Sequence, residues 1–117
     1  MSLSKEQCNF ARDISMLIVQ INLKGYDVTF GEALRTQEQA DLYAKEGKGI
    51  HDSLHCKKLA IDLNLFKDDA YITDYKEYEQ FGKYWESLDP LNRWGGYFVS
   101  KYGGHIVDSD HYERNVK

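Results

Sequence analysis

The apolar positions in the first part of the chain follow a helical period. They recur every three or four residues between positions 4 and 23, which places them on one face of a predicted helix: Phe10, Ile14, Leu17, Ile18 and Ile21. Ser4 and Gln7 have the spacing of a capping box, and Lys24-Gly25 supplies a stop signal. We expect this helix to be structural.

The pattern then changes from that of a strand to that of a second helix. Tyr26–Phe30 predicts a short strand. A second capping box, Thr36 with Gln39, opens a helix that runs to about residue 46. Glycines end this helix and begin a loop over residues 47–53.

Strict alternation marks the segment Leu59–Phe66 as a strand. One face carries the large aliphatic side chains Ile61, Leu63 and Leu65. The opposite face carries Asp62, where a pocket could lie. Asp68-Asp69 predicts a turn after the strand.

The last third of the chain combines one helix with strands. Residues 73–88 predict a helix whose apolar stripe comprises Tyr78, Phe81, Trp85 and Leu88. Asp89-Pro90 ends it. Strands are expected around Trp94–Val99 and around His111, joined by a turn at Gly103-Gly104. We therefore predict an α+β fold, with a small antiparallel sheet flanked by helices, in one domain over residues 1–117.

Charge and patterning exclude several classes of protein. The net charge of −4 is unlike the basic footprint of a nucleic-acid-binding protein. The longest apolar run, Met16–Val19, cannot span a bilayer, and the first residues lack the apolar core of a secretory signal. We expect a monomer that starts in the cytoplasm and does not insert into membranes. Cys8 and Cys56 give no reason to expect a disulfide.

Three residues form a candidate ligand set for a catalytic metal. His55, Asp62 and His111 supply two imidazoles and a carboxylate, which suit zinc with one open coordination position. Asp108, three residues before the last histidine, could transfer protons as general base and then general acid. Arg35 could stabilise charge on a reacting carbonyl or hold a substrate carboxylate.

Each of these residues also has an ordinary interpretation. Histidines are commonly surface residues, and Asp108 and Asp110 could be turn residues. Arg35 could pair with a surface acid, either Glu32 or Glu38. Cys56 is an alternative metal ligand, and the same donors also suit iron or manganese.

The ordered motifs resemble a known family, the zinc D-alanyl-D-alanine carboxypeptidases, D,D-dipeptidases and phage L-alanyl-D-glutamate endopeptidases. Ser53-Leu-His55 followed by Asp62 is similar to the first part of the family signature, and Asp108-Ser-Asp-His111 to the second. Arg35-Thr36 and Arg93-Trp-Gly-Gly96 resemble its flanking segments. The resemblance covers about residues 26–113 and implies the small α+β fold shared with the hedgehog N-terminal domain.

The resemblance also implies roles for these residues. His55, Asp62 and His111 would bind Zn²⁺, and Asp108 would be the catalytic acid-base. Arg35 would stabilise the reacting carbonyl or hold substrate. The supporting or substrate-binding set would comprise Ser53, Gln39, His105 and Glu113. His105 could instead be a plain loop histidine, and Glu113 an exposed acid.

The implied activity is hydrolysis of a peptidoglycan stem peptide, and we expect the single domain over residues 1–117 to act without a separate cell-wall-binding domain. An aspartate as catalytic acid is more similar to the phage endopeptidase branch, which favours the L-Ala–D-Glu bond and release to the cell wall through a holin-type pore. Lys58 stands where the family commonly has glycine, and Tyr97 where it tends to have an acid. The alternatives are a D,D-carboxypeptidase or dipeptidase, and an inactive phage structural module of the same fold.

Overall fold

The computed structural model describes residues 2–34, 36–45, 54–98 and 108–116. The helices are α1 (Leu3–Leu23), α2 (Gln37–Lys45) and α3 (Tyr75–Leu88), with 3₁₀ turns η1 (Leu54–Lys57) and η2 (Gly95–Tyr97). The strands are β1 (Asp27–Phe30), β2 (Ala60–Lys67), β3 (Ala70–Tyr71), β4 (Asn92–Trp94) and β5 (His111–Arg114). The predicted α+β class is confirmed. Within the described residues, no helix combines the length and the apolarity needed to cross a membrane.

The ends of α1 are set by local hydrogen bonds. Ser2, not the predicted Ser4, is the N-cap, and its Oγ accepts the N–H of Lys5 at 3.2 Å. The helix therefore begins slightly earlier than the sequence indicated. At the other end Gly25 adopts a φ of 90°, a left-handed conformation that glycine tolerates, and its N–H donates to the carbonyl of Asn22 at 3.0 Å.

The sheet places β2 and β5 at its centre. The strand order is β1-β2-β5-β4 with antiparallel neighbours, and β3 pairs with the end of β2. Asp68 and Asp69 have φ values of 52° and 64° and form the two-residue turn between β2 and β3. The sequence predicted this turn, but not the short strand that follows it.

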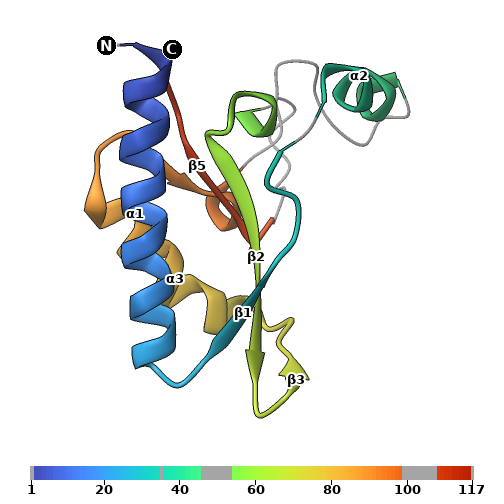
Figure 1. The fold of residues 1–117 in the computed structure, drawn as a ribbon. Helices are drawn as coiled ribbons and strands as arrows, with labels where there is room; N and C mark the ends of the chain where they lie inside the picture. The colour runs from blue at the N-terminus through green and yellow to red at the C-terminus, as the bar shows by residue number, and fades with distance from the viewer. Residues whose placement is uncertain (1, 35, 46–53, 99–107, 117) are drawn as a thin grey trace.

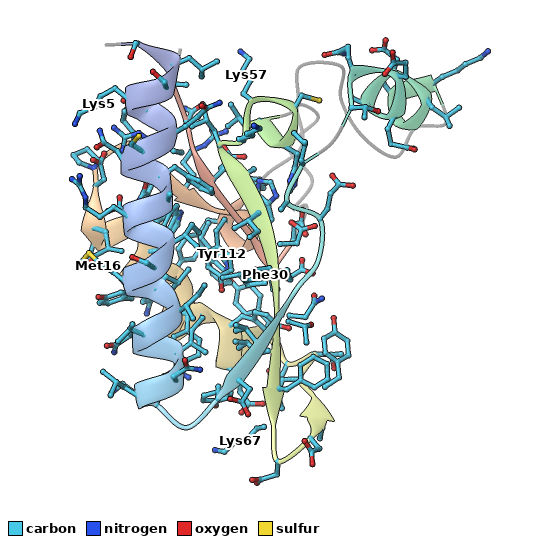
Figure 2. The ribbon with its side chains drawn as sticks, viewed as in Figure 1. Lys5, Met16, Phe30, Lys57, Lys67 and Tyr112 are labelled. Atoms are coloured by element: carbon cyan, nitrogen blue, oxygen red, sulfur yellow. The ribbon has the colours of Figure 1, made fainter. Side chains whose placement is uncertain are left out.

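The core lies between one face of the sheet and the helices α1 and α3 (Figure 1). The predicted inward residues of β2 are buried: Ile61, Leu63 and Leu65. The largest fully buried side chains are Trp85, Trp94 and Tyr112. Figure 2 shows Tyr112 between α1 and the sheet, and Met16 on the outer side of α1. The other face of the sheet carries the polar side chains of the candidate site.

The segment after α3 departs from its prediction. The expected strand over Trp94–Val99 ends at Trp94, and η2 follows. The chain turns so tightly over the Trp94 ring that a Cβ on Gly96 would lie 2.2 Å from that ring. The expected loop over 47–53 and the turn at Gly103-Gly104 lie outside the described residues.

Candidate metal centre

Three neighbouring elements bring His55, Asp62 and His111 together. Asp62 on β2 is directly opposite His111, the first residue of β5, and opposite residues of an antiparallel pair share a face. That face is the one turned away from the core. His55 lies on η1, immediately before β2. Lys58 has a φ of 57°, a left-handed value that explains why glycine suits this position.

The three donor atoms form a nearly equilateral triangle. Nε2 of His55 lies 3.2 Å from Nδ1 of His111, and that atom lies 3.3 Å from Oδ1 of Asp62. The third edge, from Nε2 of His55 to Oδ1 of Asp62, is 3.5 Å. Tetrahedral ligands at zinc bond lengths of about 2.0–2.1 Å are separated by about 3.3 Å. The group could therefore hold a metal ion, and it fits zinc.

The charges of the triad support one another. Burial acts to raise the pKa of Asp62, but hydrogen bonds with His111 and His55 outweigh it and lower the pKa to about 2. Burial acts to lower the pKa of His111, but its bonds with Asp62 and Glu113 raise the pKa to about 9. The metal-free site thus holds a proton that a cation would replace.

A buried carboxylate orients the ring of His111. Nε2 of His111 lies 2.7 Å from Oε1 of Glu113, so Nδ1 is the nitrogen left for a metal. The other oxygen of Glu113 accepts the Nε–H of Arg93 at 2.8 Å. Burial acts to raise the pKa of Glu113, but these two partners lower it. This arrangement is typical of the outer contacts of zinc-bound histidines.

Asp108 lies beside the triad at the turn that leads into β5. Its Oδ2 is 4.0 Å from Nδ1 of His111, and its side chain is 47% exposed. Gly95 fixes this turn: its carbonyl accepts the N–H of Asp108 at 3.1 Å, and a Cβ on it would lie 2.2 Å from the Asp108 carbonyl oxygen. A carboxylate in this position can reach a group bound at the triad.

Asp110 is a second titratable group of the same turn. Burial raises its pKa to about 7, with further contributions from a hydrogen bond with Asp108 and the charge of Asp62. The sequence pattern around Asp110 predicts only a turn residue. The signal that could have identified it is the spacing of two acids around one turn, next to a candidate ligand.

Comparison with known proteins gives a structural likeness. No family model matches the chain, and no curated protein matches it. Among solved structures, the crystal structure of the Serratia marcescens L-Ala D-Glu endopeptidase ChiX is similar, with a TM-score of 0.66 and 15% sequence identity. The match covers 86% of this chain and 77% of that one. The two proteins share a fold.

The other candidate residues lie outside the described part of the chain, on α2 or on η1. Arg35, Ser53 and His105 are outside the described residues. Gln39 is in the first turn of α2, where its N–H donates to Oγ1 of Thr36 at 3.1 Å, as expected for the second helix cap. Cys56 lies with its Sγ 3.7 Å from the Thr36 carbonyl oxygen.

The aromatic residues Trp94, Tyr97 and Tyr112 differ in their exposure. Trp94 and Tyr112 are fully buried in the core and cannot line a groove. Tyr97 is 40% exposed and packs its ring against Trp94, with its hydroxyl 3.3 Å from Glu79. It is the last residue of η2, and we expect its exposed part to be available for substrate contact.

Proposed function

We propose that this protein is a zinc-dependent peptidase that hydrolyses peptidoglycan stem peptides at the L-Ala–D-Glu bond. The observation that carries the proposal is the triangle of donor atoms from His55, Asp62 and His111, with edges of 3.2, 3.3 and 3.5 Å. The sequence motifs support it independently. The shared fold with a protein described as an L-Ala D-Glu endopeptidase favours this substrate class.

The three donors would hold the metal through Nε2 of His55, Nδ1 of His111 and a carboxylate oxygen of Asp62. A zinc ion with three protein ligands acts as a Lewis acid toward a carbonyl oxygen and lowers the pKa of water. Glu113 keeps the His111 ring in the tautomer that presents Nδ1. His55 and His111 are both buried, so the surrounding protein shields these two ligands from solvent.

Asp108 is the proton carrier of the proposed reaction. Its half-exposed carboxylate accepts a proton from the attacking water and delivers it to the nitrogen of the leaving amine. Asp110, whose pKa is raised to about 7, is hydrogen-bonded to Asp108. A proton on Asp110 therefore orients the Asp108 carboxylate.

Arg35 has the substrate-facing role in this proposal. Its guanidinium would hold a carboxylate of the stem peptide or stabilise negative charge on the reacting carbonyl. This role rests on the sequence, both on the residue type and on the family resemblance.

The test combines metal analysis with product analysis. Protein purified without chelator should contain about one zinc per chain, and it should release fragments from purified sacculi whose masses correspond to cleavage between L-Ala and D-Glu. Asp108→Asn should keep its zinc and lose about 10²–10⁴-fold in rate. Absence of metal would refute the proposal, and release of D-alanine alone would assign the activity to a D,D-carboxypeptidase.

A further inference from the structure

The two histidines of the triad face it with different ring nitrogens. His111 presents Nδ1 and His55 presents Nε2 to the common point. The remaining nitrogen of each ring faces a carboxylate. For His111 this is Glu113 at 2.7 Å, and for His55 it is Glu32, whose Oε1 lies 3.9 Å from Nδ1.

Glu32 is held in place by the residue that supplies the carboxylate of the triad. The N–H of Gly31 donates to the carbonyl of Asp62 at 2.8 Å, and the N–H of Asp62 donates to the carbonyl of Glu32 at 2.9 Å. These two bonds continue the β1–β2 ladder beyond Phe30. The backbone of Glu32 is thus fixed relative to the metal site.

Gly31 allows this close approach. A Cβ on Gly31 would lie 2.9 Å from Cβ of Asp62, closer than such atoms approach in proteins, and 3.5 Å from Nδ2 of Asn64. Any other residue would push the chain away from β2. The missing side chain therefore brings Glu32 next to His55.

We propose that Glu32 is the positioning residue of His55, as Glu113 is for His111. The inference rests on the proposed metal site. An imidazole that binds a metal through Nε2 carries its proton on Nδ1, and a carboxylate that accepts this proton fixes the ring and raises its basicity. The proposed contact is a hydrogen bond of about 2.7–3.2 Å in the metal-loaded protein, shorter than the 3.9 Å separation seen here, and the Glu32 side chain is 26% exposed.

The test is zinc affinity, measured by competition with a chromophoric chelator, together with the absorption spectrum of the Co²⁺-loaded protein. Glu32→Ala should weaken zinc binding about 10–100-fold. Glu32→Gln, whose amide oxygen still accepts a hydrogen bond, should restore part of the loss. Asp27→Asn, which removes an exposed carboxylate from β1, the strand that precedes Glu32, should bind zinc like the unmodified protein.

The outcomes separate this inference from the proposed function. If the unmodified protein binds no zinc, the proposed function fails. If it binds zinc and Glu32→Ala binds within twofold of it with the same Co²⁺ spectrum, Glu32 has no positioning role. Equal losses in the Ala and Gln variants, with a lowered melting temperature of the metal-free protein, would also overturn the inference, because they indicate a structural effect.

Gly31→Ala is the second variant. It should fold and retain β1. It should bind zinc less tightly, because the added Cβ pushes the segment that follows β1 away from Asp62. Unchanged zinc affinity in this variant would overturn the claim that Gly31 brings Glu32 into position beside His55.

Discussion

The two histidines of the candidate metal centre are supported by different kinds of structure. His111 begins a central strand, is paired with β2 across the sheet, and has its ring bound to Glu113 at 2.7 Å. Glu113 in turn is bound to Arg93. His55 lies on a single 3₁₀ turn, and its carboxylate neighbour Glu32 is 3.9 Å away. One half of the site is built into the sheet, and the other depends on a short turn.

This difference indicates how a metal would couple to folding. The His111 side has a complete set of polar contacts without a metal, so its geometry is preformed. On the His55 side, the proposed hydrogen bond with Glu32 forms only when the proton of the ring is on Nδ1, as it is when Nε2 binds a metal. Metal binding should therefore stabilise η1 more than β5. The free energy of metal binding stabilises most the segment that is least ordered in the metal-free protein.

The largest expected effect is the loss of zinc binding on removal of either histidine, and the stability of the metal-free variants separates the two. His55→Ala and His111→Ala should each abolish stoichiometric zinc binding, because two ligands do not make a catalytic site. The metal-free proteins should differ. His111→Ala leaves Oε1 of the buried Glu113 without its partner, which costs about 1–3 kcal/mol, whereas the contacts of His55 with His111 and Asp62 are longer, at 3.2 and 3.5 Å.

Zinc content by atomic emission and urea unfolding in the presence of chelator measure both effects. Equal stability losses in the two variants would show that the His111 side is not the more firmly built half.

The next effect is a dependence on pH in which stability and zinc affinity move in opposite directions. The pKa of His111 is raised from 6.5 to about 9 in the folded protein, so the folded state binds this proton more tightly than the unfolded state. The resulting stabilisation of the metal-free protein is complete below pH 6.5 and is lost as the pH rises through 9. The pKa of Asp62 is lowered from 3.8 to about 2, so its contribution is complete above pH 3.8 and is lost as the pH falls through 2.

Zinc must displace the His111 proton, so its affinity should rise about tenfold per pH unit between pH 6.5 and 9. Urea unfolding of metal-free protein and chelator competition across this range measure the two trends. A zinc affinity that is constant between pH 7 and 8.5 would contradict the assignment of His111 as a ligand that is protonated in the metal-free protein.

The sheet side of the site is the side that the sequence reveals. Alternation over β2 placed Asp62 opposite the aliphatic residues because side chains of a strand have a period of two. The same period puts Glu113 on the face of His111. Both are local relations, and the structure confirms the two faces of β2 and places His55 beside Asp62.

The other side depends on contacts between distant segments, which local patterning does not contain. Nothing in the pattern relates Glu32 to His55, because their proximity comes from two backbone bonds beyond the end of β1. The strand predicted over Trp94–Val99 was placed too late in the chain, since β4 covers Asn92–Trp94 and the 3₁₀ turn η2, which depends on packing against Trp94, follows it. β3 was missed because two residues are too short to show alternation.

The smallest expected effect concerns Cys56, the residue next to His55 on the less firmly built side. Its Sγ lies 3.7 Å from the carbonyl oxygen of Thr36, and the candidate ligand group among the described residues does not include it. Cys56→Ser should therefore leave zinc content and affinity unchanged and alter stability by less than about 0.5 kcal/mol. The exposed Cys8, changed to serine, is the matched control.

The Co²⁺-loaded protein should lack a thiolate charge-transfer band before and after the change of Cys56. A band that disappears in Cys56→Ser, together with weaker metal binding, would mean that η1 supplies a thiolate to the metal, and that the His55 half of the site rearranges further than the approach of Glu32 to His55.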